Sequence, residues 1–326
     1  MELRSPFINE FGRLRSGWRL IIYVALFVAL NFVAATIVRI VYAFVFNRLP
    51  TIPHAEYLSD FTFRCVLLVL ALISGFVCAR FLEGLPWRSL GLTLHQGWFR
   101  DLVIGSIIGI LTLVFAVGLG AAAGGLSFTL ISSALLPAAG KTLLTSAALF
   151  IVAALAEEAA FRGYPLQTMS RAKLAWLGLL LTSLPFAAVH LTNPNVVPSA
   201  TFANTALAGI WLGVAYLRTR SLWFPLGVHW SWNWALGSVC GLPVSGITIF
   251  SHTLFLGKDL GPAWLTGGSY GIEGGIACTV ALILSTVFIW RTRWVSATPE
   301  LLQLTTEENP VRHSSVITAN QVDARP

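Results

Sequence analysis

The sequence has few charged residues. Only 11% of its 326 residues are Asp, Glu, Lys or Arg, whereas a soluble domain carries about 25%. Hydrophobic residues make up 56% of the chain and its mean hydropathy is +0.76. These values exclude an ordinary soluble domain and predict a protein whose partner is the lipid bilayer. The basic residues interrupt apolar segments instead of lining one polar face, so no nucleic-acid partner is expected.

Cysteine is also scarce. Cys65, Cys78, Cys240 and Cys278 lie far apart, in or beside apolar segments, without the close spacing of metal-binding cysteines. This pattern predicts buried thiols and excludes a disulfide framework. The sequence contains no internal repeat.

Long apolar runs, in contrast, are abundant. A membrane-spanning helix needs about 20 mainly apolar residues, and the sequence predicts an all-α polytopic membrane protein with about eight such helices. The first run is longer than the apolar core of a signal peptide and is expected to be a retained helix. The expected spans are 20–38, 62–82, 102–122, 142–168, 174–192, 201–217, 222–240 and 275–294.

The distribution of Lys and Arg predicts the orientation. Basic residues are concentrated in the N-terminal segment, in every second connection and at the C-terminal end. The alternate connections hold only Arg48, Lys141 and Lys258. Because cytoplasmic loops carry the excess of Lys and Arg, both termini are expected in the cytoplasm.

Polar residues inside the apolar runs are few and clustered. Of 14 acidic residues, only Glu157 and Glu158 interrupt an expected span, and of six histidines only His190 and His229 do so. Ionisable groups within a membrane are costly and usually mark function. Arg162, four residues after Glu158, also allows a purely structural ion pair. That pair does not explain Glu157, which lies about 140° away from Arg162 on an ideal helix.

Two of these positions have informative neighbours. His190 ends the stretch "FAAVH", and Pro194 follows shortly, so a helix is expected to end or bend there. A single histidine on a helix is often only a hydrogen-bonded core residue. His229 begins "HWSWN", which places Asn233 one turn later on the same helix face. An imidazole beside a carboxamide is a suitable donor pair for an oxyanion.

These stretches resemble a known family. "EEAAFR" matches EExxxR, "FAAVH" matches FxxxH and "HWSWN" matches HxxxN, in this order on three separate expected spans. The chain is thereby similar to the CPBP (ABI) intramembrane proteases, which include type II CAAX prenyl endopeptidases and bacterial relatives linked to bacteriocin processing and immunity. "RGYPLQ" also fits the family, and the resemblance covers about residues 140–240.

The resemblance implies an intramembrane endopeptidase with its active site in the core of the helix bundle. Glu157 would be the general base and His190 would polarise the same water, while His229 and Asn233 would stabilise the oxyanion. Glu158 and Arg162 would support the site. The implied substrate is a membrane-associated peptide or protein, with a prenylated tail among the candidates, and the implied location is the bacterial inner membrane.

The role of a metal remains open from the sequence. Glu157, His190 and His229 could ligate a divalent metal such as zinc and leave one position free. The sequence has no HExxH motif, however, and a carboxylate–histidine pair can activate water without a metal. Other intramembrane protease classes fit poorly, because the expected spans contain neither an aspartate pair nor a GxSG motif.

Two other functions use the same residues. A non-enzymatic membrane scaffold or bacteriocin-immunity protein would keep the polar groups only for helix packing. A proton-coupled transporter would use Glu157 and His190 as a proton relay.

The sequence suggests five segments. A basic cytoplasmic segment, 1–19, precedes the first three helices within 20–139, and the protease core follows at 140–240. Residues 241–294 comprise a non-cytoplasmic glycine-rich loop and the last helix, and the loop is expected to make a tight re-entrant turn. The polar tail, 295–326, is expected to be a disordered cytoplasmic segment.

Overall fold

The computed structural model describes residues 5–48 and 55–306, and each of the eight expected spans coincides with a helix in it. The predicted tail beyond residue 306 and Arg4 of the basic N-terminal segment lie outside the described residues. The main elements are α1 (Ser16–Arg48), α2 (Ala55–Glu83), α3 (Trp98–Ala122), β1 (Leu126–Leu130), α4 (Leu136–Glu158), α5 (Tyr164–Arg171), α6 (Ala175–His190), α7 (Pro198–Thr219), α8 (Trp223–Trp234), β2 (Phe255–Asp259), α9 (Ala263–Thr266), α10 (Ile276–Arg291) and α11 (Pro299–Thr306).

The predicted fold class, an all-α polytopic membrane protein, is confirmed. Five helical stretches are long and apolar enough to cross a membrane: α1, α2, α3, the continuous stretch Ser133–Arg171, and α7. Helices α6 and α10 are apolar but have only 16 residues each. Helix α8 has 12 residues, which is too short to span a bilayer, and most of it is buried in the bundle.

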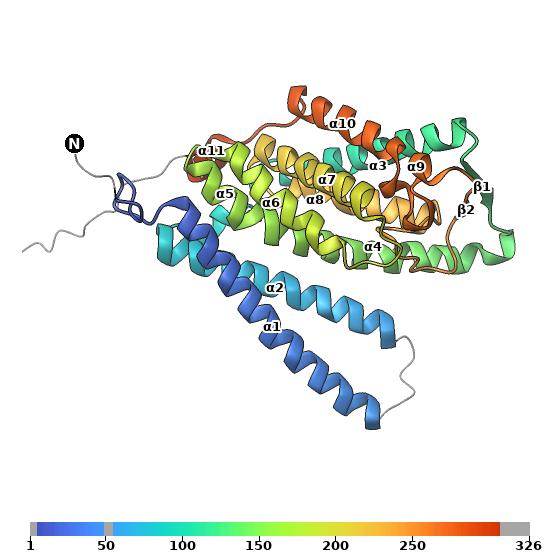
Figure 1. The fold of residues 1–326 in the computed structure, drawn as a ribbon, viewed down its shortest axis with the longest axis horizontal. Helices are drawn as coiled ribbons and strands as arrows, with labels where there is room; N and C mark the ends of the chain where they lie inside the picture. The colour runs from blue at the N-terminus through green and yellow to red at the C-terminus, as the bar shows by residue number, and fades with distance from the viewer. Residues whose placement is uncertain (1–4, 49–54, 307–326) are drawn as a thin grey trace, which may run out of the picture.

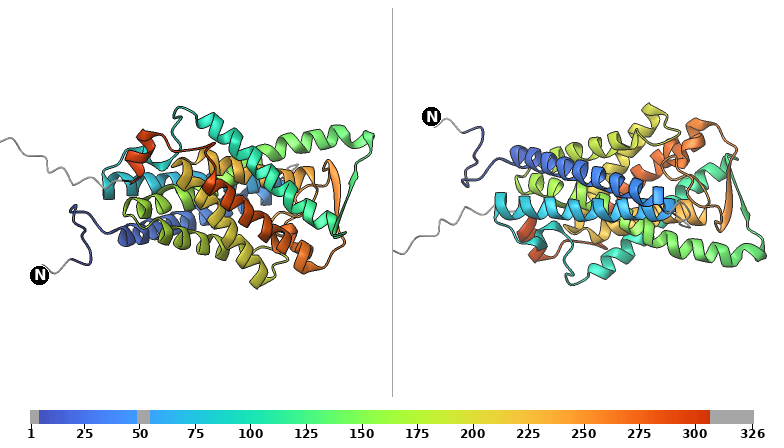
Figure 2. Two further views of the ribbon diagram at one scale, coloured as in Figure 1. Left: turned by 90° about the horizontal axis from the view of Figure 1, so that it is seen from above. Right: turned by 90° about the horizontal axis from the view of Figure 1, so that it is seen from below.

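The helices form a long bundle with the N-terminal hairpin along one side (Figure 1). Helices α1 and α2 run beside the bundle, and α2 packs against α4. The N-terminal segment and α11 lie at one end of the molecule, and β1 and β2 lie at the other (Figure 2). The two ends therefore carry different types of structure, short helical segments at one and a small sheet at the other.

Small residues bring α8 against α3. A Cβ atom on Gly105 would lie 2.3 Å from the carbonyl oxygen of Phe224, and one on Gly227 would lie 2.3 Å from that of Leu102. Only glycine permits this approach, which is the usual way in which helices pack closely inside a membrane. The contact holds α8, with its "HWSWN" stretch, in the centre of the bundle.

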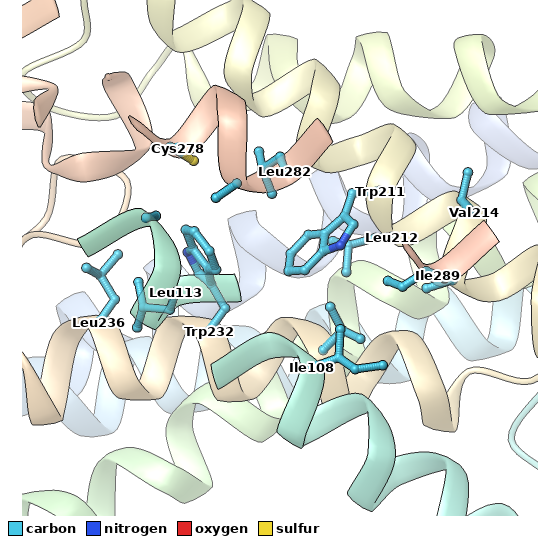
Figure 3. Close-up of a cluster of buried hydrophobic side chains, with 14 of the residues drawn as sticks. Ile108, Leu113, Trp211, Leu212, Val214, Trp232, Leu236, Cys278, Leu282 and Ile289 are labelled. Atoms are coloured by element: carbon cyan, nitrogen blue, oxygen red, sulfur yellow. The ribbon is translucent and has the colours of Figure 1, made fainter. Parts of the chain in front are cut away.

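The buried core lies between α3, α7, α8 and α10 (Figure 3). Trp211 of α7 and Trp232 of α8 meet edge to face, with their ring centroids 5.7 Å apart. Trp211 donates a hydrogen bond of 2.9 Å to Ser285 of α10, so its polar edge is satisfied. The close packing of these large rings fixes the position of α8, which carries the "HWSWN" stretch, against α7.

A two-stranded antiparallel sheet was not predicted. Strands β1 and β2 pair from Leu126 opposite Asp259 to Leu130 opposite Phe255. More than 120 residues separate the strands, and such non-local pairing cannot be recognised from either short segment alone. Asn204 of α7 donates hydrogen bonds to the carbonyl oxygens of Glu273 and Gly275, which connects the glycine-rich loop to α7.

The expected disordered tail begins with an ordered segment. Helix α11 buries Leu301 and Thr305, and Glu300 forms an ion pair of 2.8 Å with Arg88. The expectation of disorder is wrong for this part of the tail. The apolar positions are too few to reveal a helix, and their burial depends on contacts with α5 and the short helix Trp87–Leu90.

A buried charge cluster joins the N-terminal hairpin to the bundle. Glu83, at the end of α2, is 1% exposed and lies 2.7 Å from the guanidinium of Arg19 in α1. The same carboxylate contacts Arg171 of α5 and accepts a hydrogen bond of 2.9 Å from Thr168. The cluster therefore connects three helices, α1, α2 and α5.

Removing this carboxylate is expected to destabilise the protein strongly. Glu83→Gln would leave the buried guanidinium groups of Arg19 and Arg171 without the charge that they face, at a cost of about 3–5 kcal/mol. The matched control is Glu300→Gln, because the pair of Glu300 with Arg88 is about half exposed and should contribute at most about 1 kcal/mol. Thermal unfolding of both variants in detergent measures the difference. Equal melting temperatures would contradict the role assigned to Glu83.

Candidate active site

A cavity of about 230 Å³ lies inside the bundle, and all four predicted catalytic side chains line it: Glu157, His190, His229 and Asn233. They come from α4, α6 and α8, and the first and last of them, Glu157 and Asn233, are 76 positions apart in the chain. The supporting residues Glu158 and Arg162 are fully buried behind this surface. The fold thus places the three sequence motifs on one site.

A change in helix type occurs directly after the two glutamates. Helix α4 ends at Glu158, and residues Ala159–Gly163 form a π-helical segment before α5 begins. Arg162 lies in this segment and reaches the Glu158 carboxylate at 3.2 Å. Its other terminal nitrogen donates to the carbonyl oxygen of Gly209 in α7 at 3.1 Å. Such π-helical turns are frequent at functional sites.

His229 contacts both glutamates. Its Nδ1 lies 2.8 Å from Oε1 of Glu158, and its Nε2 lies 3.7 Å from Oε2 of Glu157. Because a carboxylate only accepts, Nδ1 carries a proton and donates it to Glu158. Glu158 therefore does more than pair with Arg162, since it also fixes the orientation of the His229 ring. The sequence did not reveal this contact, because α4 and α8 are far apart in the chain.

His190 is held by its own helix. Its Nδ1 lies 2.7 Å from the carbonyl oxygen of Phe186, so Nδ1 carries the proton and Nε2 of the neutral ring holds a free electron pair. The Phe186 ring packs against the His190 ring at 4.6 Å and lies 4.5 Å from the guanidinium carbon of Arg162. Phe186, the first residue of the "FAAVH" stretch, thus contacts both the His190 ring and the guanidinium of Arg162.

Glu157 and Asn233, the other two predicted catalytic residues, are available to a ligand. The carboxylate of Glu157 is 22% exposed, and its contact with His229 exceeds hydrogen-bond distance. Within residues 58–306, neither the Glu157 carboxylate nor the Asn233 carboxamide has a hydrogen-bond partner. A second π-helical segment, Ala235–Val239, follows Asn233 closely.

A metal held by Glu157, His190 and His229 stays a prediction. Among the described residues, no group of three His, Cys, Asp or Glu side chains is arranged to hold a metal. The Nδ1 atoms of His190 and His229 donate to Phe186 and Glu158, which leaves Nε2 of each ring for the cavity, as in histidines that ligate a metal. The steps proposed below use the side chains of the chain itself.

The cavity also has charged residues that the sequence reasoning did not place there. Glu273, in the glycine-rich loop, accepts hydrogen bonds from the Trp232 indole at 3.0 Å and from the Ser245 hydroxyl at 3.1 Å. Arg64, in the first half of α2, also lines the wall of the cavity. Neither residue belongs to the three motifs. Arg64 could have been identified from the sequence because it is a charged residue inside an apolar run, as Glu157 is.

The comparisons with known proteins cover the segment that contains the four predicted catalytic residues. Residues 138–235 match the family described as "Type II CAAX prenyl endopeptidase Rce1-like". An "Uncharacterized 24.3 kDa protein" of Escherichia coli is 38% identical over 90 residues, which is 27% of this chain and 40% of the relative. No solved structure matches.

The protein is thus an integral membrane protein whose residues 138–235 are similar to the type II CAAX prenyl endopeptidases. The match confirms the resemblance carried by the three motifs, and its bounds lie close to the core expected at residues 140–240. The chain spans 40% of the length of this relative.

The contacts of Glu158 predict a combined loss of stability and activity. Glu158→Gln would remove the charge that faces both Arg162 and His229, so the melting temperature should fall. Turnover of a cleaved peptide should fall as well, by about 10- to 100-fold, because a charged partner of the His229 ring is lost.

The control is Ser146→Ala in the same helix. The Ser146 hydroxyl accepts a buried hydrogen bond of 2.7 Å from Ser238, outside the cavity wall. Its loss should lower the melting temperature without changing kcat. If Glu158→Gln also left kcat intact, Glu158 would be a packing residue only.

Proposed function

We propose that the protein is an intramembrane endopeptidase, which hydrolyses a peptide bond of a membrane-associated peptide or protein in the cavity. The observation that carries the proposal is the convergence of Glu157, His190, His229 and Asn233 on one cavity. A structural ion pair alone would need only Glu158 and Arg162, which lie behind the wall. The four cavity groups have the types and positions that hydrolysis needs.

Water activation is assigned to Glu157 and His190. Glu157 presents an unbonded carboxylate to the cavity, where a general base must lie. His190 presents Nε2, which can accept a hydrogen bond from the same water. As the water oxygen bonds to the carbonyl carbon, one proton passes to Glu157. When the tetrahedral intermediate breaks its C–N bond, Glu157 returns that proton to the leaving amine.

Stabilisation of the oxyanion is assigned to His229 and Asn233. The Asn233 amide can donate directly. His229 already donates through Nδ1 to Glu158, so it donates into the cavity through Nε2 when the ring carries both protons. The carboxylate of Glu158 then stabilises the imidazolium charge, which is the role that a buried acid has beside a catalytic histidine.

The proposal also covers substrate class and orientation. A cavity enclosed by membrane helices favours a substrate that is itself in or on the bilayer, including a lipid-modified tail. We place both termini on the cytoplasmic side of a bacterial inner membrane, in accordance with the distribution of Lys and Arg. The end that carries β1 and β2 would then face away from the cytoplasm.

The decisive variant is Glu157→Gln. The amide has the same shape as the carboxylate, and its contact with His229, at 3.7 Å, is longer than a hydrogen bond, so the melting temperature should change little. The rate constant kcat should fall by about 10² or more, which is the usual loss when a general base is removed. The measurement is turnover of a fluorogenic peptide panel by purified protein.

His190→Ala should be similarly inactive, and Asn233→Ala should lower kcat more than it raises KM. A scaffold protein would turn over no peptide in any form. A transporter would show solute flux driven by a pH gradient in vesicles. Normal turnover by well-folded Glu157→Gln protein would refute the proposed mechanism.

Reporter fusions test the orientation separately. Because β1 pairs with β2, fusions near residues 124 and 261 should report the same side of the membrane. A fusion after residue 306 should report the opposite, cytoplasmic side. An external signal from the C-terminal fusion would reject the proposed orientation while leaving the active site unaffected.

A further inference from the structure

Glu273 brings a second carboxylate to the cavity wall, and it lies outside the matched residues 138–235, in the glycine-rich loop. Its side chain is partly buried. Whereas Glu158 faces the guanidinium of Arg162, the carboxylate of Glu273 faces neutral hydrogen-bond donors. A partly buried charge held in this way depends on those hydrogen bonds to compensate for its lost solvation.

The donors require an acceptor at both oxygens. Oε1 of Glu273 accepts a hydrogen bond of 3.0 Å from the indole N–H of Trp232. Oε2 accepts one of 3.1 Å from the Ser245 hydroxyl and another from the backbone N–H of Ser245. An indole N–H and a backbone N–H can only donate. A glutamine of the same shape would therefore turn its NH2 group toward one of these two N–H groups.

Trp232 connects Glu273 to the residues assigned to the oxyanion. It lies on α8 between His229 and Asn233, and all three side chains line the cavity. The Trp232 ring is 4% exposed and packs against Trp211 of α7. A shift of this indole would therefore move the helical turn that carries both oxyanion donors.

Ser245 connects Glu273 to His190. The carbonyl oxygen of Ser245 accepts a hydrogen bond of 3.1 Å from the Asn193 side chain, and the backbone N–H of Asn193 donates to the carbonyl oxygen of His190 at 3.1 Å. Ser245 has a φ of 48°, which is uncommon for a residue other than glycine. The two hydrogen bonds to Glu273 hold Ser245 in this conformation, with its carbonyl oxygen at Asn193.

We propose that Glu273 is a positioning residue, which fixes the distance between His190 and the donor pair His229 and Asn233. The inference rests on the proposed function and adds a contribution from outside the matched residues. Glu158 holds α8 through His229, and Glu273 holds the same helix through Trp232 and connects it to the end of α6. The reacting atoms must approach to about 3–3.5 Å, so a small change in this distance lowers the rate.

Glu273→Gln tests the inference with little change in shape. In full-length protein in nanodiscs, kcat for a cleaved peptide should fall on the order of 10-fold with little change in KM, because displaced groups lose contacts that matter only in the transition state. A higher KM at unchanged kcat would overturn the inference, since Glu273 would then contact the substrate itself. Normal kcat and KM would overturn it as well.

Trp232→Phe provides a test by partial rescue. The substitution removes the indole N–H and keeps an aromatic ring, so an amide NH2 at position 273 no longer meets a donor there. In this background, Glu273→Gln should lower kcat by about twofold or less, because the two residues act through one contact. The same loss in both backgrounds would overturn the inference.

The matched control is Asp259→Ala, in the same segment between α8 and α10. Asp259 accepts hydrogen bonds of 2.8 Å from the Thr266 hydroxyl and 3.0 Å from the backbone N–H of Gly261, and it does not line the cavity. Its loss should lower the melting temperature and leave kcat unchanged. An equal fall in kcat for Asp259→Ala and Glu273→Gln would overturn the inference, because the stability of the whole segment would then set the rate.

Hydrogen exchange of the same proteins distinguishes this inference from the proposed function. Glu273→Gln should increase amide exchange in residues 191–196 and in residues 232–236, and Asp259→Ala should not. This increase, in a protein whose wild-type form cleaves no peptide, would reject the peptidase and retain the positioning role. Unchanged exchange in both segments, with peptide cleavage by the wild-type protein, would retain the peptidase and reject the positioning role.

Discussion

The geometry of the site depends on one buried carboxylate. Glu158 is inaccessible to solvent, yet it meets Arg162 at 3.2 Å and His229 at 2.8 Å. A lone charge in this position would be very costly, so the partners and the carboxylate require one another. Through Arg162 the same group connects to Gly209 of α7. One residue of α4 thus fixes α7 and α8 relative to the adjacent Glu157, the proposed base.

The irregular parts of the helices serve this arrangement. The π-helical segment after Glu158 holds Arg162 between α4 and α7, where it contacts both Glu158 and Gly209. Close contact through Gly105 and Gly227 allows the short helix α8 to lie inside the bundle, although it could not span a membrane by itself.

Much of the fold was predictable because the length of an apolar run is a strong local signal of a membrane-spanning helix. Each expected span contains a helix, and the three motifs identified Glu157, His190, His229 and Asn233, which share one cavity. Contacts between distant segments were not predictable. The pairing of β1 with β2 and the bond from His229 to Glu158 depend on tertiary structure, and neither leaves a periodic pattern in the sequence. The sequence predicted an ideal α-helix near Arg162, whereas the structure has a π-helical segment there.

Two parts of the chain line the cavity. The polar groups that fit hydrolysis all lie within the matched residues 138–235, whereas Arg64 and Glu273 come from α2 and the glycine-rich loop outside them. Transition-state stabilisation requires groups held rigidly around the reacting carbonyl, and the Glu158 contacts supply that rigidity. The carboxylate of Glu273 contacts Trp232 and Ser245, which lie beside the same groups in the cavity wall. A loop outside the matched residues can therefore affect the rate of the proposed reaction without supplying a group that reacts.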